Sequence, residues 1–526
     1  MSTTITNKAG IDLPYWRPLA NAATAASTGS CLAIDQRNSE DRIPIVYYLP
    51  AAANLYAYYP KNDDWGFTAY GAALAGTFGA GNALVVAPSV GPRGTITTGA
   101  TTTSVVLSTA LPASVGVNQL ANRGDGTGFK LRIVDNGSGG SGKTAEVYIT
   151  GNTSGTTPTI YWTGAIGFTP VTGSAYEFLS GVVYLLNAGT QASGSFKSFD
   201  IATSAFSSLS ITNLPATITT DSCFVAFDEL YVPNTQTPGT GFLGNLTATG
   251  SSSTSLTGQA ASGDSGVVAN QYRNFQIRII QDTSNVTAVG QRRVIVSHTA
   301  GTSPVYTVTT WTVTPSTTAQ YVIENANWLF LWTSAATTTY VYANYAITGG
   351  GSSGTGLTAN TWTSTQFNAR GGAVGAGCSA WQPFGMTLDT QANARYSYTY
   401  SMRGGTTSTI DLFDIAAAAA GTATAAITYG GPQNVAAAGN SAAYESLGVP
   451  AGRYTYFNWQ ATTHCSRFDN INRVMEPIAF MPYATAGTVV GSRMCIYPIF
   501  DGATSIGTTI LQRGSAVEMF GCLNLR

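Results

Sequence analysis

The sequence predicts an all-β fold built from many short strands. Its 526 residues include 59 Gly, 27 Tyr, 21 Phe and 9 Trp. Glycine supplies turns, and aromatic and β-branched residues favour strands. Short runs with apolar residues at every second position recur along the chain, and long stretches rich in Leu, Glu and Lys are absent. The length suffices for about two to four domains, each with its own core.

A strand rich in aromatic residues, a short turn and a second strand recur about six times along the chain. The first pair lies in residues 1–92, where Val46–Leu49 leads to Leu55–Tyr59. We interpret each pair as part of one blade of a β-propeller, and the segment Ser30–Ile34 as the strand that closes the ring. The later pairs begin at Val183–Leu186, Trp328–Leu331, Tyr396–Tyr400, Tyr454–Phe457 and Met494–Tyr497.

One of these pairs resembles a blade of the kelch family. Tyr184–Gly189 gives an aliphatic strand and a turn, and Phe199–Thr203 gives an aromatic residue, an Asp and an aliphatic residue before Leu209. The Gly-Gly pair usual after the first strand is replaced here by Asn187-Ala-Gly189. The resemblance implies a kelch-like β-propeller of about six blades.

Residues 93–181 and 242–326 align with each other as an internal repeat. Phe129–Ile133 matches Phe275–Ile279, and further matches follow in the same order at offsets of 145 to 147 residues. Leu131 and Ile133 share one face of a strand, while Lys130 and Arg132 point to the other. Each copy is predicted to form a β-sandwich or barrel of about five to seven strands, since about 85 residues suffice for one core.

The predicted domain order follows from these two patterns. Residues 1–92 hold an N-terminal segment and the first blade, and residues 93–181 are inserted β-module 1. Residues 182–241 form a blade, residues 242–326 are inserted β-module 2, and residues 327–526 hold the remaining blades. Propellers accept such insertions because their connecting loops lie on the rim.

The composition narrows the classes of function. Only 9% of the residues are charged and the formal net charge is -1, so no basic surface for specific nucleic-acid binding is expected. No run of 18 apolar residues indicates membrane insertion, and Met1–Lys8 lacks the apolar core of a signal peptide. A surface of Thr, Ser, Gly, Ala and Asn has weak self-repulsion, which suits a homo-oligomer in a permanent symmetric assembly.

A phosphate-loop pattern occurs once, at Gly137–Thr144. Such a loop requires a helix directly after the Thr, whose first amide groups bind phosphate. Here an alternating run, Ala145–Ile149, follows instead. We therefore predict a glycine hairpin and no nucleotide site.

Other candidate residues have structural explanations that we prefer. The two histidines, His298 and His464, have no partner with a catalytic signature, so each is expected to be a satisfied or exposed side chain. Asp63-Asp64 and Asp135-Asn136 have oxygens suitable for calcium but lack its ligand spacing, so turn capping is preferred. No catalytic, cofactor or metal-binding residue is predicted. Buried thiols are expected for Cys31, Cys223, Cys378, Cys465, Cys495 and Cys522.

The two modules resemble small β-domains of tailed-bacteriophage virion proteins. The shared features are a Gly/Thr-rich start, the strand Phe275–Ile279 and its counterpart, and the closing Thr169-Pro170 and Tyr176–Phe178. The resemblance implies a non-enzymatic structural protein of the virion, made in the host cytoplasm and bound to other virion proteins, at a tail nozzle or hub ring. A capsid decoration or vertex protein is an alternative, as is an adhesin for a host-surface glycan or receptor. A propeller hydrolase or lyase is a further one.

Overall fold

The computed structural model confirms that the protein is all-β, with many antiparallel sheets. No helix within the described ranges has the length and apolar character of a membrane span. The structure describes residues 16–22, 24–25, 31–35, 45–50, 54–60, 62–66, 74, 78, 83–87, 90–123, 127–219, 222–226, 246–258, 268–343, 347–348, 356–375, 378–381, 398–403, 409–416, 423–428, 454–458, 465–469, 473–478, 493–501, 504–512 and 517–524.

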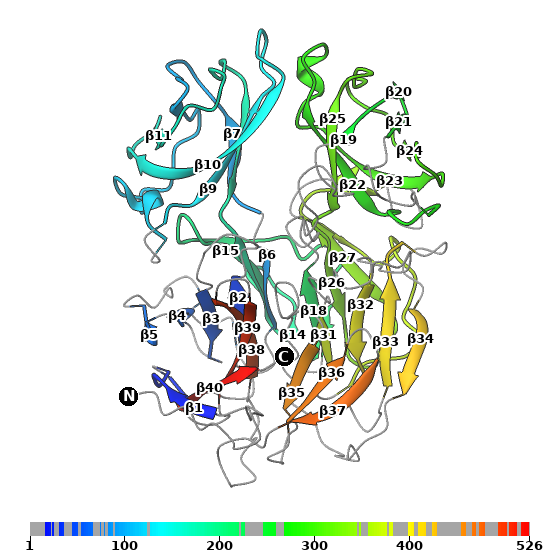
Figure 1. Ribbon diagram of the computed structural model, residues 1–526. Helices are drawn as coiled ribbons and strands as arrows, with labels where there is room; N and C mark the ends of the chain where they lie inside the picture. Colours follow the sequence, from blue (N-terminus) through cyan, green and yellow to red (C-terminus); the bar gives the residue numbers. More distant parts are fainter. Residues whose placement is uncertain are drawn as a thin grey trace.

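In the described residues, six separate antiparallel sheets of three or four strands lie together in one half of the molecule (Figure 1), and we call them the platform. The first sheet is β2 (Cys31–Asp35), β3 (Ile45–Leu49), β4 (Tyr56–Tyr59) and β5 (Asp64–Trp65). The second is β6 (Ala83–Ala87), β13 (Val182–Leu186), β15 (Phe196–Asp200) and β16 (Ala205–Ser208). The third is β18 (Cys223–Ala226), β26 (Leu329–Trp332), β27 (Thr339–Ala343) and β30 (Thr361–Thr363).

The strands of the other three sheets come from the C-terminal part of the chain, except β1. The fourth is β31 (Ser379–Trp381), β32 (Tyr398–Met402), β33 (Thr409–Asp414) and β34 (Ala423–Thr428). The fifth is β35 (Tyr454–Asn458), β36 (Cys465–Asp469) and β37 (Val474–Ile478). The sixth is β38 (Arg493–Asp501), β39 (Thr504–Gln512), β40 (Met519–Asn524) and β1 (Trp16–Leu19). Two short strand pairs lie outside these six sheets: β14 (Gly189–Thr190) with β17 (Thr217–Ile218), and β28 (Ile347–Thr348) with β29 (Gly356–Leu357).

Contacts between the sheets of the platform run from the sixth to the first and from there in order to the fifth. Their first strands form a series in which β38 contacts β2, β2 contacts β6, β6 contacts β18 and β18 contacts β31. Aromatic side chains fill the space between neighbouring sheets, and such rings contribute both burial and favourable edge-to-face geometry. The pairs, with their centroid separations, are Tyr47–Phe199 at 6.0 Å, Phe196–Tyr342 at 4.9 Å, Phe330–Phe413 at 5.4 Å and Tyr400–Phe468 at 5.5 Å.

The strand that joins the two ends of the chain differs from the expected one. Cys31–Asp35, which overlaps the predicted closing strand, is β2 and pairs with β3 in the first sheet. Instead β1 pairs with β40, with Trp16 opposite Cys522 and Leu19 opposite Met519. Pro18 within β1 weakened the strand pattern, but a proline is tolerated at a sheet edge, and β1 is the edge strand of its sheet.

The aligned segments, which we call the first repeat (93–181) and the second repeat (242–326), have the same strand pairing. In each, a central strand pairs with two neighbours, and a bulge lies after the equivalent Ile149 and Ile295. The first repeat has β7 (Arg93–Thr95), β8 (Ser104–Val106), the 3-10 helix η2 (Gln119–Ala121), β9 (Lys130–Asp135), β10 (Lys143–Asn152), β11 (Thr159–Trp162) and β12 (Ala175–Leu179). The second has β19 (Leu246–Thr247), β20 (Gly250–Ser252), β21 (Ser255–Thr257), β22 (Phe275–Gln281), the 3-10 helix η4 (Val286–Ala288), β23 (Arg292–His298), β24 (Val305–Val308) and β25 (Gln320–Asn325).

Each repeat is inserted within a sheet, between that sheet's first and second strands. Ala87, before the first repeat, is paired with Val182 directly after it. In the same way, β18 before the second repeat pairs with β26 after it. The sequence indicated insertion between blades, because strand patterns do not reveal which strands pair across an inserted segment.

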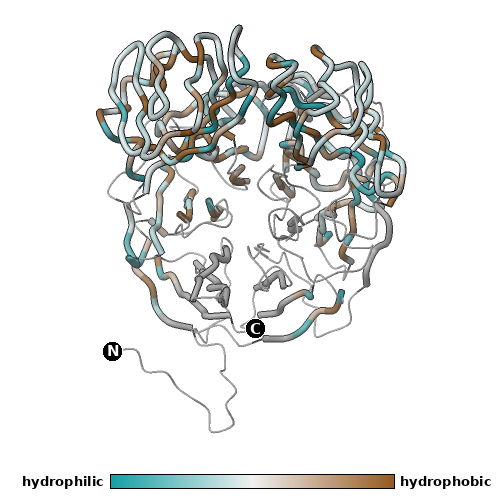
Figure 2. The backbone as a smooth tube through the Cα atoms, turned by 45° about the horizontal axis from the view of Figure 1, so that its top comes forward, coloured by the Kyte–Doolittle hydropathy of each residue, from teal (hydrophilic) through white to brown (hydrophobic). Residues whose placement is uncertain are grey.

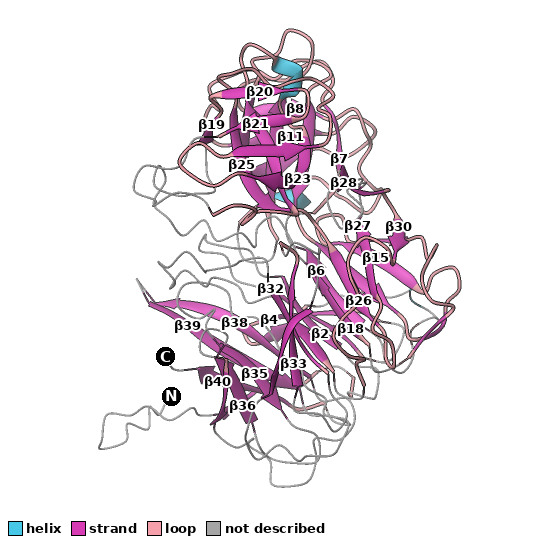
Figure 3. Cartoon of the chain, turned by 90° about the vertical axis from the view of Figure 1, so that its right-hand side faces the viewer, coloured by secondary structure: helices cyan, strands magenta, loops and turns pink. Residues whose placement is uncertain are grey.

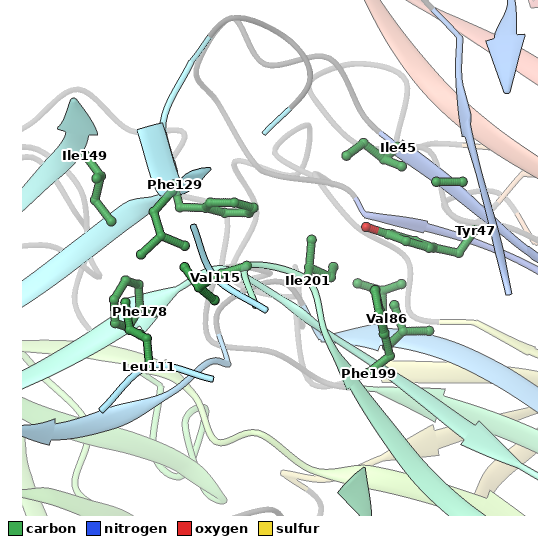
Figure 4. Packing of buried hydrophobic residues seen from close by; sticks show 14 of the residues in the cluster. Ile45, Tyr47, Val86, Leu111, Val115, Phe129, Ile149, Phe178, Phe199 and Ile201 are labelled. Carbon is green, nitrogen blue, oxygen red and sulfur yellow. The ribbon is translucent and has the colours of Figure 1, made fainter. Parts of the chain in front are cut away.

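The two repeats stand side by side (Figures 1 and 2), and the view from the side places both on the same side of the platform (Figure 3). The core of the first repeat is continuous with the platform core (Figure 4). Ile201, at the end of β15, lies between Val115 of the repeat and Val86 of the platform. The repeat therefore sits on the second sheet through buried apolar contacts as well as through its two connections.

Candidate functional site

The glycine loop with the phosphate-loop pattern lies between β9 and β10, at the contact between the two repeats. Lys143 and Thr144 begin β10, so a strand follows the loop, as predicted. The carbonyl oxygen of Gly142 accepts a hydrogen bond from the N–H of Asp282 at 2.8 Å. A side chain at position 142 would fall on the carbonyl oxygen of Asp282, and its φ of +65° also favours glycine. The glycine therefore permits close approach of the second repeat.

Asp135 and Asp282 hold equivalent loops of the two repeats. The carboxylate of Asp135 accepts hydrogen bonds from the Val171 N–H at 3.0 Å and the Ser174 hydroxyl at 2.7 Å. The carboxylate of Asp282 accepts one from the Ser316 N–H at 2.7 Å. Burial raises the pKa of Asp135, but its hydrogen bonds outweigh this and hold that pKa below its usual value.

The other predicted turn residues also make hydrogen bonds, with different partners. Asn136 donates from its amide to the Val289 carbonyl of the second repeat at 2.9 Å. Asp63 accepts from the Tyr58 hydroxyl at 2.6 Å, and Asp64 accepts from the Trp65 N–H at 2.8 Å. The Asp64 contact is local, as expected for a turn residue, whereas Asn136 bonds to the other repeat and Asp63 to a tyrosine hydroxyl.

His298 is a buried structural side chain. The Tyr272 N–H donates to its Nε2 at 2.9 Å, so Nδ1 carries the proton and donates to the Thr299 carbonyl at 2.9 Å. Burial lowers the pKa of His298, which keeps the ring neutral at pH 7. Its satisfied state was predicted. His464 lies outside the described residues.

Two of the predicted buried cysteines are buried in the structure. Cys31 and Cys223 are buried, and Cys378 is only partly buried. The side chains of Cys465, Cys495 and Cys522 lie outside the described part of the structure. Within that part, no group of three or more His, Cys, Asp and Glu side chains is arranged to hold a metal ion.

The densest group of charges in the described residues is a network between the repeats, which sequence reasoning did not identify. We call it the inter-repeat ion network. It is formed by Arg93, Lys130, Arg132, Glu146, Glu177, Arg278, Arg292 and Glu324. Since only 9% of the residues are charged, such a concentration at one contact distinguishes it from the rest of the protein.

Glu177 on β12 is the centre of this network. Its Oε2 atom pairs with Arg132 of the first repeat at 2.9 Å and with Arg292 of the second at 2.6 Å. Its Oε1 atom pairs with Arg93. Burial raises the pKa of Glu177, but the guanidinium groups around it outweigh burial and hold that pKa well below its usual range.

Glu324 on β25 plays the corresponding part in the second repeat. It receives two hydrogen bonds from Arg278, at 2.9 and 3.0 Å, in the bidentate geometry that suits a guanidinium and a carboxylate. Burial opposes ionisation of Glu324, yet the neighbouring arginines lower its pKa. Arg292 lies between the two carboxylates, 3.9 Å from Glu324, and so joins the two halves.

At one position that is equivalent in the two repeats, the first repeat has a negative and the second a positive side chain, and this difference favours their contact. Glu146 lies opposite Arg132 on β9, and Arg292 lies opposite Arg278 on β22. The first repeat therefore has an acidic residue where the second has a basic one. Aligning the outward-facing positions of the repeats, rather than only their apolar positions, would have shown this exchange.

The inter-repeat ion network has the properties of a structural contact and not those of an acid–base catalytic site. Its buried carboxylates are kept ionised by arginine, so neither Glu177 nor Glu324 has the raised pKa that a general acid needs near neutral pH. Arginine remains protonated and does not act as a base. The arrangement instead holds two segments together with directional, charge-assisted hydrogen bonds.

Further buried polar contacts fix each repeat to the platform. Arg123 of the first repeat pairs with Asp35 of β2 at 2.9 Å, with both side chains fully buried. In the second repeat, Asn274 donates to the Ile415 carbonyl of the fourth sheet at 2.5 Å. The Trp328 indole in turn donates to the Asn274 carbonyl at 3.2 Å. Buried polar pairs thus hold both repeats in place. Removing one partner of such a pair lowers the free energy of unfolding more than removing an exposed polar contact does.

Comparisons with known proteins add only distant likenesses. No family model matches the chain, and no curated protein matches it. A solved structure of NanB with optactamide is similar at 7% identity and a TM-score of 0.25, over 94% of this chain and 82% of that one. A GH74 xyloglucanase from Xanthomonas campestris is similar at 11% identity and a TM-score of 0.17, over 95% of this chain and 87% of that one.

Proposed function

We propose that the protein is a non-enzymatic structural subunit of a tailed-phage virion, of the kind that forms a ring at a tail nozzle or hub. The observation that supports this most is the inter-repeat ion network. It joins Glu177 of the first repeat to Arg292 of the second, so that the two projecting modules are held against each other. Two modules held together on the platform suit a ring subunit that transmits force to adjacent virion proteins.

We further propose that the platform is a six-bladed β-propeller. Six small antiparallel sheets, a series of contacts between their first strands, and pairing of β1 with β40 all support this arrangement. Pairing a strand from one end of the chain with the sheet at the other end joins the first and last blades. The two repeats are then insertions in the second and third blades.

The absence of catalysis is part of the same proposal. Several buried carboxylates in the described residues serve as acceptors for arginine or backbone N–H groups, as Glu177, Asp135 and Asp411 illustrate. Asp411 pairs with Arg370 at 2.7 Å and with Arg403 at 2.7 Å. Carboxylates engaged in this way contribute to a fixed structure rather than to proton transfer.

The proposal is tested by locating the protein in particles. Particles released by lysis are purified, separated into heads and tails, and analysed by mass spectrometry. We expect peptides of this chain in the tail fraction at a fixed stoichiometry to other tail proteins. Peptides confined to heads would instead support a capsid decoration or vertex position, and absence from both fractions would refute a virion role.

A further inference from the structure

His298 in the second repeat and Asn152 in the first occupy the same position of the repeated fold. Each lies three residues after the isoleucine at which the strand bulges, Ile295 and Ile149. Both side chains are buried, with 4% of His298 and 1% of Asn152 exposed. One buried position thus has a side chain that titrates near neutral pH in the second repeat, and one that does not in the first.

The backbone around this position is bonded in the same way in both repeats. Asn270 and Asn118 each have a left-handed backbone, with φ values of 62° and 59°. The amide oxygen of Asn270 accepts from the His298 N–H at 2.9 Å, and that of Asn118 accepts from the Asn152 N–H at 3.3 Å. In return, the N–H groups of Asn270 and Asn118 donate to the carbonyls of His298 and Asn152, at 3.1 and 2.8 Å.

The two side chains also make equivalent hydrogen bonds, but with different chemical groups. Oδ1 of Asn152 accepts from the Leu120 N–H at 2.9 Å, and Nε2 of His298 accepts from the Tyr272 N–H at 2.9 Å. Each side chain donates from its other nitrogen to the carbonyl of the threonine that follows it, at 3.0 and 2.9 Å. The same clamp is therefore built with an amide in the first repeat and with an imidazole in the second.

This difference matters because only the imidazole can lose its acceptor atom to a proton. A backbone N–H can only donate, so Nε2 of His298 must have a free lone pair for Tyr272. Nδ1 already carries a proton, and a second proton taken from solvent adds to Nε2. The Tyr272 N–H is then buried without an acceptor and faces a positive charge, which is costly. The amide of Asn152 does not titrate in this way.

The surroundings of the His298 ring do not favour a positive charge. In the described part of the chain, the titratable groups that face it are Tyr272, whose ring stacks on it at 5.6 Å, Tyr306 at 5.2 Å, with Tyr321 packed against Tyr306, and Arg273. β28 also contacts β23 but contains no titratable residue. Burial lowers the pKa of His298 and the charge of Arg273 lowers it further, although the bond to the following carbonyl opposes both.

The segment held by His298 also attaches the second repeat to the platform. We call residues 268–274 the anchoring segment. Its last residue, Asn274, donates its N–H to the Ile295 carbonyl on β23 at 2.9 Å. The side chain of Asn274 donates to the Ile415 carbonyl of the fourth sheet, and its carbonyl accepts from the Trp328 indole. Loss of the bond at His298 therefore weakens a segment that connects β23 to the fourth sheet.

We propose that His298 is an acid-sensitive switch: protonation of its ring releases the anchoring segment and loosens the second repeat from the fourth sheet, while the first repeat stays closed. This conformational response goes beyond the proposed function and does not depend on it. The matched clamp around Asn152 is its built-in reference, because it has the same hydrogen bonds and no titratable ring.

The pH range of the response follows from the direction of the pKa shift. The folded protein holds the pKa of His298 below its ordinary value of 6.5, so the clamp is fully stabilising above that pH and loses stability as pH falls below it. The population of the open segment should increase by up to about tenfold for each pH unit in this range. Glu177 and Glu324 stay ionised there, since their pKa values lie below 4.5.

Hydrogen–deuterium exchange of the full-length chain tests the proposal, read by mass spectrometry between about pH 7.5 and 5.5 and normalised to the unfolded chain at each pH. The reporting amides are those of Tyr272 and Leu120. We expect opening at Tyr272 to increase about tenfold per pH unit below about 6.5, and opening at Leu120 to stay constant. His298→Asn gives the second repeat the side chain of the first and should abolish this pH dependence.

His464→Asn is the matched control, because the chain has only two histidines. It should keep the response of wild type. The smaller side chain of His298→Asn loses ring contacts with Tyr272, so protection there should be lower at every pH without a slope. An unchanged slope in His298→Asn would overturn the proposal, and so would an equal response at Tyr272 and Leu120.

A second measurement does not depend on the folding of His298→Asn. Nuclear magnetic resonance of the wild-type chain with ¹³C-labelled histidine rings gives two signals, which His464→Asn assigns. We expect the His298 signal to titrate below pH 6.5. Titration at or above this value would overturn the proposal, because the clamp would then not oppose protonation. Absence of the chain from virions would refute the proposed function and leave this switch unaffected.

Discussion

At the scale of single residues, Glu177 links segments that lie 115 positions apart in the chain. A buried carboxylate between arginines is sensitive to removal, because the guanidinium groups lose their counter-charge but not their burial. The side chain of Arg132 is only 2% exposed, so leaving its charge unpaired costs the most free energy. Removing the charge of Glu177 should therefore weaken the contact between the repeats more than removing an exposed charge would.

We expect Glu177→Gln to lower the free energy of unfolding by about 3 kcal/mol. Glutamine keeps the size of the side chain and removes its charge. Glu146→Gln is the comparison, since Glu146 also contacts Arg132 but its side chain is 31% exposed, and it should cost less than about 1 kcal/mol. Urea denaturation at pH 7 measures both; equal losses would show that burial of the network is unimportant.

The pH dependence of stability follows from the same carboxylates. The pKa values of Glu177 and Glu324 are lower in the folded protein than the ordinary glutamate value of 4.5. Their contribution is therefore complete above that value and is lost as pH falls below it toward the folded pKa values. The thermal unfolding temperature should decrease steeply below about pH 4.5, and less steeply in Glu177→Gln. Parallel curves for the two proteins would contradict this.

Sequence reasoning succeeded for the buried face of β9 and missed its other face. The alternation at Leu131 and Ile133 correctly indicated an inward face, and both residues are fully buried. Arg132 was assigned to the other face, which is correct, but that face is covered by the second repeat. A two-residue period separates two faces and does not say what lies against either.

At the scale of elements, the β9–β10 hairpin is the part of the first repeat that approaches the second most closely. The strand after the glycine loop could be predicted, because Ala145–Ile149 alternates and a phosphate loop needs a helix there. Contact of that loop with Asp282 could not, since the two lie in separate repeats. The pairing of β6 with β13 was also beyond the sequence, because 94 residues lie between Ala87 and Val182.

Two glycines of this hairpin provide a matched pair of substitutions. Gly139 and Gly142 both have positive φ values, of 79° and 65°. An added methyl group at Gly139 meets no atom, whereas at Gly142 it meets the backbone of Asp282. Gly139→Ala should cost about 1 to 2 kcal/mol from backbone strain alone.

Gly142→Ala should lower the free energy of unfolding clearly more than Gly139→Ala does, because the second repeat must also move. Urea denaturation gives the energies, and limited proteolysis of the folded protein reports whether the repeats separate. Equal energies and equal protection from protease would show that the hairpin does not press against Asp282.

At the scale of the whole molecule, the two ends of the chain are joined by strand pairing. Fold class and the repeat were accessible from composition and alternation, but the partner of the C-terminal sheet was not. Pro18 interrupts the residue pattern by which β1 could have been predicted as a strand. The pairing of β1 with β40 also joins residues that are nearly the full sequence apart. Local patterns contain no information about such distant partners.

This pairing is tested by a cross-link. Trp16 lies opposite Cys522, so Trp16→Cys should form a disulfide with it under oxidation and raise the free energy of unfolding by about 3 kcal/mol. Non-reducing electrophoresis and peptide mapping detect the bond. Arg17→Cys is the control, because Arg17 lies opposite Gly521 and adjacent positions point to opposite faces. Equal cross-linking of both variants would contradict the register.

The direct pairing of Ala87 with Val182 also makes the second sheet a natural attachment point. A segment that leaves and returns through neighbouring positions can be lengthened, exchanged or duplicated without changing the path of the surrounding chain. Homologous segments at the corresponding place in two adjacent sheets are what gene duplication followed by grafting would produce. A foreign domain with closely spaced termini, installed between these two residues, should likewise leave the pairing of β6 with β13 unchanged.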